Sequence, residues 1–305
     1  MYNVPLTNLN QHTMKLPDSR LFCWFESGPK TGFPVIFCTG AGMSGSLGFG
    51  LDLLEKLNIR LIVPERAGLG ESTFHPEKSL KSFAMDVQAL LDEQSITQFS
   101  VVGFSQGAVF AMAVAHYCQP ISLSIVSGQD QFEYPATRAV LSADVVNMQE
   151  QALNTPEALS DWLLKNVTGE WLLAFILNCS AEIDQQLYNE EHFLEAYSHC
   201  MRRAFAQGNQ GYVQDLLIAL QKWEFTPETT RVPVSLWYGE LDMSTVHSPD
   251  FGKILASRFP NCQHHLLSDE GGSLLWTQAE AILADIQQHT AQAEAILADI
   301  QQHTA

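Results

Sequence analysis

The sequence has little positive charge. Lys and Arg together number 16, against 34 Asp and Glu, which gives a formal net charge of −18 at pH 7. A surface of this sign repels the phosphates of nucleic acids and of anionic membranes. We therefore expect neither nucleic acid nor a membrane as a partner of this protein.

Long apolar runs and paired cysteines are also missing. No run approaches the roughly 18 apolar residues of a membrane-spanning helix. The six cysteines are scattered, with no Cys-x-x-Cys pair and no spacing typical of metal ligands. Residues 1–15 are polar and lack the apolar stretch of a signal peptide. These absences predict a cytoplasmic protein that uses no metal and no other cofactor.

What is present is the composition of a packed domain, with 46% hydrophobic and 16% charged residues. Over residues 1–128, short apolar stretches typical of strands alternate with segments of helical periodicity. The strand-like stretches are 21–25, 35–38, 61–63, 99–102 and 122–126, and the helix-like ones are 47–57, 82–93 and 108–116. This alternation predicts an α/β fold with a mainly parallel sheet flanked by helices.

The pattern changes over residues 129–229, where helical periodicity dominates and strand signals are almost absent. Helices are expected at 157–166, 170–179, 192–206 and 211–222. Strand patterns return at 232–238 and 264–267, with a helix expected at 251–258 between them. We interpret residues 1–128 and 230–291 as one α/β core, and residues 129–229 as a helical cap inserted into it.

The C-terminus contains an exact repeat, since residues 278–291 and 292–305 have the same sequence. A unit of 14 residues is close to four helical turns, so its apolar stripe recurs nearly in phase. The stripe consists of Ile282, Leu283 and Ile286, and then of Ile296, Leu297 and Ile300. One copy is enough to close the domain. We therefore expect residues 292–305 to fray, to fold back or to mediate self-association.

Gly103-Phe104-Ser105-Gln106-Gly107 fits the pattern G-x-S-x-G between a strand and a helix. The two glycines permit a turn tight enough to present Ser105 at the C-terminal edge of the sheet. This strand–turn–helix context is typical of a nucleophile elbow, and it predicts Ser105 as a nucleophile.

With these residues the chain resembles the α/β-hydrolase superfamily, and within it the capped esterase-like serine hydrolases. The resemblance covers residues 18–128 and 230–291. Thr39-Gly40-Ala41-Gly42 is similar to the family's oxyanion loop, with Thr39 in place of the usual His, and it implies that the N–H groups of Ala41 and Gln106 bind the oxyanion. The segment 65–72 resembles the family's Asp-Arg turn, where we expect Arg66 to make a buried polar contact.

The resemblance also implies an acid and a base. Gly239-Glu240-Leu241-Asp242 is similar to the family's Gly-x-x-Asp, which indicates Asp242 as the carboxylate that orients a histidine. That histidine is expected in a Gly-His pair after the last strand, but it is missing between Gly271 and Gly272. His264 and His265 lie about 20 Å away along an extended strand. His247, soon after Asp242, is the better substitute.

Two functions therefore stay open. The first is hydrolysis of small carboxylic esters by Ser105, impaired if no base completes the triad, because such a loss has cost about 10⁶-fold in turnover. The second is an inactive hydrolase-fold binding protein. A third interpretation is a sequence artefact, in which the missing histidine and the exact repeat are both errors in the same C-terminal stretch. Seven cap aromatics suggest a largely apolar, ester-like substrate: Phe132, Tyr134, Trp162, Trp171, Phe175, Phe193 and Trp223.

Overall fold

Eight strands form one sheet in the computed structural model, which describes the backbone of residues 6–304 and their side chains except those of 297, 298 and 300–304. The strands are Asn10–Lys15 (β1), Leu21–Ser27 (β2), Phe33–Cys38 (β3), Ile59–Pro64 (β4), Ser100–Phe104 (β5), Leu123–Val126 (β6), Val234–Gly239 (β7) and Cys262–Leu267 (β8). Their order is β1-β2-β4-β3-β5-β6-β7-β8. The pairings β1–β2 and β2–β4 are antiparallel and the others are parallel, so the predicted fold class is confirmed.

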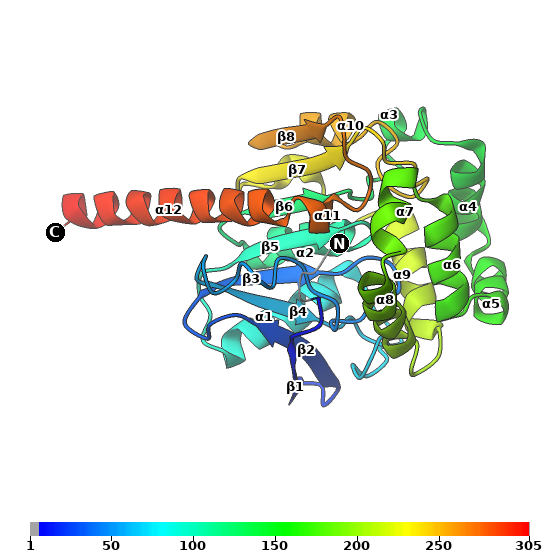
Figure 1. Cartoon of the computed structure of the whole chain (residues 1–305), viewed down its shortest axis with the longest axis horizontal. Helices are drawn as coiled ribbons and strands as arrows, with labels where there is room; N and C mark the ends of the chain where they lie inside the picture. Colours follow the sequence, from blue (N-terminus) through cyan, green and yellow to red (C-terminus); the bar gives the residue numbers. More distant parts are fainter. Residues whose placement is uncertain (1–5, 305) are drawn as a thin grey trace.

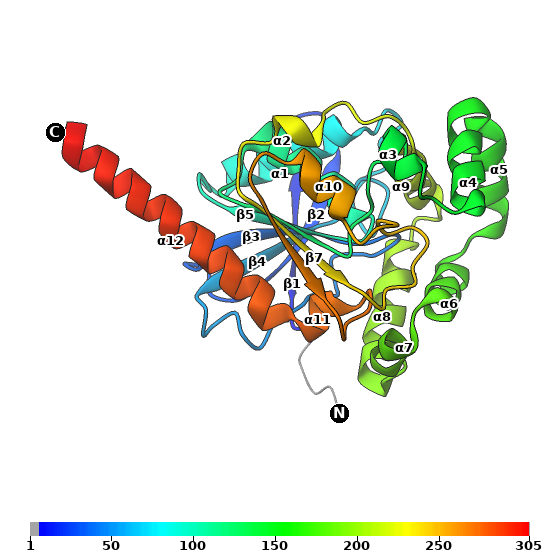
Figure 2. The same ribbon diagram turned by 90° about the horizontal axis from the view of Figure 1, so that it is seen from above.

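Helices cover both faces of this sheet (Figure 2). The helices outside residues 129–229 are Leu80–Glu93 (α1), Gly107–Cys118 (α2), Lys253–Arg258 (α10), Leu274–Thr277 (α11) and Ala279–Thr304 (α12). The first three pack on one face, and α11 with the start of α12 packs on the other. Successive residues of a strand point to opposite faces, so in β3 Phe37 joins one core and Ile36 the other. Burial on both faces explains why these strands read as continuous apolar runs.

The structure differs from the sequence-based expectation at two places. Residues 51–58 form turns rather than the expected helix over 47–57. Glycines precede this segment, and Gly50 adopts φ +58°, a conformation outside the helical region. β1 was not expected, because five of its six residues are polar. β1 is a largely exposed edge strand paired with β2 alone, a position where polar side chains are common.

A helical segment lies between β6 and β7 and gathers at one end of the sheet (Figure 1). Its helices are Pro135–Arg138 (α3), Ala143–Asn154 (α4), Pro156–Asn166 (α5), Gly169–Cys179 (α6), Glu182–Tyr188 (α7), Glu191–Ala204 (α8), Gln210–Leu220 (α9) and the 3-10 turn Pro227–Thr229. The four helices expected from periodicity match α5, α6, α8 and α9. The division of the chain into a core and a cap at residues 129–229 stays a prediction, and these helices are called the cap helices below.

Both copies of the C-terminal repeat belong to one continuous helix, α12, which extends away from the sheet (Figure 1). In the first copy, Ile282, Leu283 and Ile286 are fully buried. In the second copy, Ile296 is 61% exposed. The side chains of Leu297 and Ile300 lie outside the described residues. The first copy therefore closes the core, and Ile296 shows that the apolar stripe leaves the core before the second copy.

A chain that ends at Ala291 should keep the stability of the full chain, because the removed residues follow the buried part of α12. We expect the melting temperature to change by less than about 2 °C. Light scattering at increasing protein concentration should show association of the full chain but not of the shortened one. A fall in melting temperature by about 5 °C or more would show instead that residues 292–305 are part of the core.

Candidate active site

Ser105 lies at the turn between β5 and α2 and adopts φ +53°, in the left-handed region that non-glycine residues rarely occupy. The turn is this tight because its flanking glycines pack against backbone. A Cβ on Gly107 would lie 2.1 Å from the carbonyl oxygen of Cys38, and one on Gly103 would lie 2.6 Å from Cα of Ala108. The hydroxyl of Ser105 is thereby held at the C-terminal edge of the parallel strands.

A histidine bridges Ser105 and Asp242. Nε2 of His247 lies 2.9 Å from Oγ of Ser105, and Nδ1 lies 2.6 Å from Oδ2 of Asp242. The other oxygen of Asp242 accepts the N–H of Ser244 at 2.9 Å, which fixes the carboxylate. Because the carboxylate of Asp242 accepts a hydrogen bond from Nδ1–H, the neutral imidazole keeps its other nitrogen, Nε2, free to accept the serine proton. The three side chains can therefore move a proton from the hydroxyl to the imidazole.

The other histidines near the end of the sheet are engaged elsewhere. Nε2 of His264 lies 2.7 Å from the carbonyl oxygen of Phe251. The ring of His265 stacks on Trp237 at 3.9 Å between centroids. The sequence singled out His247 only by its position after Asp242. No spacing rule could place its ring, since the chain from 243 to 250 is an irregular loop.

The loop that lacks the expected histidine is packed closely between two carboxylates. A Cβ on Gly272 would lie 2.8 Å from Oδ1 of Asp242, and one on Gly271 would lie 2.4 Å from Oδ1 of Asp184. Asp184, on cap helix α7, accepts the N–H groups of Gly272 at 3.0 Å and Ser273 at 2.8 Å. The sequence did not indicate this role of Asp184, because nothing local links it to a loop 88 residues later.

The backbone N–H groups predicted to bind an oxyanion belong to the same cavity as Ser105. Ala41 and Gln106 both line it, together with His247. Within the described part of the chain, neither N–H donates to a protein acceptor. Two unpaired donors beside a serine hydroxyl are an arrangement that can bind the negative oxygen of a tetrahedral intermediate.

The cavity beside Ser105 has a volume of about 280 Å³ and is lined largely by apolar side chains of the cap helices. Of the seven aromatics named from the sequence, Trp162, Trp171 and Phe175 line it. They are partly exposed, and the last two stack with centroids 5.4 Å apart. By contrast, Phe132, Phe193 and Trp223 are buried in the cores. The apolar lining suits an uncharged acyl or alkyl group.

The charged groups of the cavity are acidic. Its lining includes Asp144, Asp184 and Asp242, and among the described residues it includes no Lys or Arg. Burial raises the pKa of the lining residues Tyr197 and Tyr212, so both phenols stay neutral. Among the described lining residues, His247 is the one basic side chain.

Two kinds of feature are absent from the described residues. No group of three or more His, Cys, Asp or Glu side chains there could hold a metal ion. No helix in that part of the chain has the length and apolar character needed to cross a membrane.

Residues 35–284 match the profile of the "Alpha/beta hydrolase family". Similar solved structures include a thermophilic esterase from Thermogutta terrifontis, with TM-score 0.69, 17% identity and coverage of 93% of this chain and 98% of the other. A putative aryl esterase from Burkholderia cenocepacia has TM-score 0.65, 18% identity and coverage of 94% and 100%. An enol-lactonase from Burkholderia xenovorans LB400 has TM-score 0.65, 14% identity and coverage of 92% and 100%. At these identities the likeness shows the fold. A comparison with curated proteins gave no match.

Inserting a histidine between Gly271 and Gly272, where the sequence motif lacks one, should destabilise the chain. A Cβ on either flanking glycine would already meet a carboxylate, that of Asp184 or that of Asp242, so the loop has no room for a further residue. We therefore expect a melting temperature lower by about 5 °C or more. The matched control is the same insertion after Gly208, which has no atom within 4 Å of its Cβ position. A stable insertion variant with increased esterase activity would contradict this description of the loop.

Proposed function

This chain belongs to the alpha/beta hydrolase family, and we propose that it is a serine hydrolase that cleaves small carboxylic esters. The observation that supports this proposal most directly is the pair of His247 contacts, at 2.9 Å to Ser105 and 2.6 Å to Asp242. The alternative, an inactive binding protein, was motivated by a missing base. Because His247 lies in hydrogen-bond contact with Ser105, a base is available, and the reason for proposing an inactive protein no longer applies.

In the proposed first half-reaction, Oγ of Ser105 attacks the ester carbonyl carbon while Nε2 of His247 takes its proton. The carbonyl π electrons move to the oxygen, and the N–H groups of Ala41 and Gln106 donate to the oxyanion that forms. The oxyanion then collapses and the bond to the leaving alcohol breaks. His247 returns its proton to the oxygen of that alcohol, which leaves an acyl group on Ser105.

Water completes the cycle by the same steps. His247 removes a proton from the water as its oxygen attacks the acyl carbon, and the second tetrahedral intermediate uses the same two N–H donors. Collapse releases the carboxylic acid, and the proton on His247 returns to Oγ of Ser105. Asp242 stabilises the imidazolium in both halves without taking its proton. Every proton and electron pair of this scheme is handled by the chain, the ester and water, so the proposed reaction needs no cofactor.

We further propose that the substrate is a neutral ester with a small, largely apolar acyl or alkyl group. The cavity offers apolar side chains, neutral phenols and carboxylates, and its lining among the described residues contains no Lys or Arg to neutralise an anion. The net charge of −18 also disfavours the approach of an anionic substrate. It also disfavours nucleic acids and anionic membranes as partners. A cytoplasmic location and self-association through the C-terminal repeat remain proposals of the same kind.

Replacing either catalytic candidate should abolish most of the activity. For p-nitrophenyl butyrate we expect Ser105→Ala and His247→Ala each to lower kcat by about 10³- to 10⁶-fold, because the two groups act as one unit. His192→Ala, which removes an exposed imidazole on α8, is the control and should keep the rate of the parent chain. Activity in His247→Ala close to that of the parent would rule out His247 as the base.

Anionic esters should be poor substrates compared with neutral ones of equal length. We expect kcat/KM for mono-p-nitrophenyl succinate to be lower than that for p-nitrophenyl butyrate by about 10-fold or more at low salt. Asp144→Asn removes an exposed carboxylate of the cavity lining and should reduce this ratio, whereas Asp161→Asn, outside the lining, should not. Equal rates for both esters in the parent chain would contradict the proposed substrate class.

A further inference from the structure

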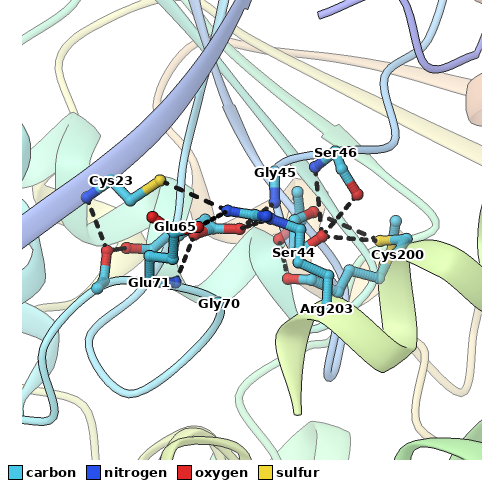
Figure 3. A network of polar contacts seen from close by, with 12 residues as sticks. Cys23, Ser44, Gly45, Ser46, Glu65, Gly70, Glu71, Cys200 and Arg203 are labelled. Carbon is cyan, nitrogen blue, oxygen red and sulfur yellow. Dashed lines mark hydrogen bonds and ion pairs between the residues drawn. The ribbon is translucent and has the colours of Figure 1, made fainter. Parts of the chain in front are cut away.

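Two adjacent residues after β4 hold the loop that carries Ala41. The guanidinium of Arg66 donates from Nη1 to the carbonyl oxygen of Thr39 at 2.6 Å and from Nη2 to that of Gly40 at 2.8 Å. The carboxylate of Glu65 accepts the N–H of Gly45 at 3.3 Å (Figure 3). Residues 39–45, here called the oxyanion loop, are thus fastened near both ends by neighbouring side chains of opposite charge.

The contact at Gly40 has a direct consequence for the next peptide group. In a trans peptide the C=O and the following N–H point in opposite directions, and no cis peptide occurs in the described chain. Because the oxygen of Gly40 is directed at Arg66, the N–H of Ala41 is directed away from it. Gly40 and Ala41 line the cavity beside Ser105. The direction of this N–H therefore follows from the contacts of the Gly40 oxygen, which accepts from Nη2 of Arg66 at 2.8 Å and, more weakly, from the N–H of Met43 at 3.4 Å.

Arg66 is itself held by a cap helix. Its Nε donates to Oδ2 of Asp215, on α9, at 2.7 Å, and the other oxygen of Asp215 pairs with Nζ of Lys78 at 2.5 Å. All three side chains are buried, with at most 1% of each exposed. Burial lowers the pKa of Lys78, and the charge of Asp215 opposes that shift. A buried charge that loses its partner destabilises the protein strongly. The guanidinium of Arg66 therefore cannot rotate away from Asp215 without a large energetic cost.

The same arrangement occurs with reversed charge at the other end of the loop. Glu65 accepts from Nε of Arg203, on α8, at 3.2 Å, and Arg203 also reaches Glu71 (Figure 3). Each side chain that fastens the oxyanion loop is therefore paired with an opposite charge from a cap helix. The two contacts differ in their distance from the chemistry, since Arg66 binds the carbonyl next to Ala41 whereas Glu65 binds Gly45.

We propose that Arg66, oriented by Asp215 of the cap helix α9, is a positioning residue that aims the Ala41 N–H at the oxyanion. This inference rests on the proposed ester hydrolysis. Arg66 does not touch the substrate in this account. Its contribution arises in the tetrahedral state, when negative charge develops on the carbonyl oxygen, so its loss lowers kcat more than it raises KM.

Asp215→Asn is the direct test, because it removes the charge that orients Arg66 and keeps the size of the side chain. We expect kcat/KM for p-nitrophenyl butyrate to fall by about 10- to 10³-fold, mainly through kcat, since one oxyanion donor is worth about 10²- to 10³-fold. An alkyl trifluoromethyl ketone forms an oxyanion when Oγ of Ser105 adds to its carbonyl. Its inhibition constant should rise by a similar factor.

Asp86→Asn is the matched control. Asp86 forms a bidentate ion pair with Arg20, at 2.6 and 2.9 Å, and it is buried on α1 away from the cavity. Its loss should lower the melting temperature without changing kcat or the affinity for the ketone. If Asp215→Asn fails to fold, Asp215→Glu keeps the buried charge and displaces it by one methylene, with Asp86→Glu as its control. Activity and ketone affinity in the Asp215 variants equal to those of the Asp86 variants would overturn the proposal.

The amide resonance of Ala41 separates this inference from the proposed function. If the parent chain hydrolyses no ester, the proposed function fails, and the ¹H–¹⁵N resonance of Ala41 still reports the orientation of the peptide. We expect that resonance to shift in the Asp215 variant and to stay in place in the Asp86 variant. An Ala41 resonance that is unchanged in both variants contradicts the role of Arg66 whatever the activity.

Discussion

The hydrogen bond of 2.6 Å between Asp242 and His247 is the contact on which the rest of the site depends. It holds a proton on Nδ1 and leaves Nε2 to accept from Ser105 at 2.9 Å. Asp242 and His247 come from one loop after β7, and Ser105 comes from the strained turn after β5. Because β6 alone separates these strands in the sheet, their C-terminal ends bring the three groups together. The loop after β8 therefore contributes no side chain to the proposed proton transfer.

The loop after β8 instead contacts the cap helix α7. Gly271 and Gly272 pass between Asp242 and Asp184, and the second of these carboxylates belongs to α7. Asp215 on α9 makes a buried ion pair with the turn after β4, and Arg203 on α8 makes a partly buried one. Three cap helices thus each contribute a charged side chain to a loop of the site. Since breaking a buried pair is strongly destabilising, movement of the cap helices would disturb the oxyanion loop as well as the cavity.

The sequence predicted the parts of this protein that depend on local patterns. The turn that carries Ser105, the position of Asp242 after β7 and the alternating strands are encoded within short segments. The roles of Ser105 and Asp242 stay predictions. The position of His247 was only one alternative, because it depends on the path of an irregular loop. The helices α3, α4 and α7 were not expected. With four and seven residues, α3 and α7 are too short to show a helical repeat, whereas α4 has apolar residues at helical spacing that the sequence analysis missed. The ion pair between Arg66 and Asp215 joins residues 149 positions apart, and no local pattern indicates it.

The central claim, that His247 activates Ser105, can be tested most directly by covalent labelling. A fluorophosphonate reacts with a serine whose proton is removed by an adjacent base, and it reports on this step without dependence on a chosen ester. The labelled residue is identified by mass spectrometry of the digested protein. We expect rapid modification of Ser105 in the parent chain and slowing by about 10³-fold or more in His247→Gln. Equal labelling rates in both proteins, or labelling elsewhere, would contradict the account.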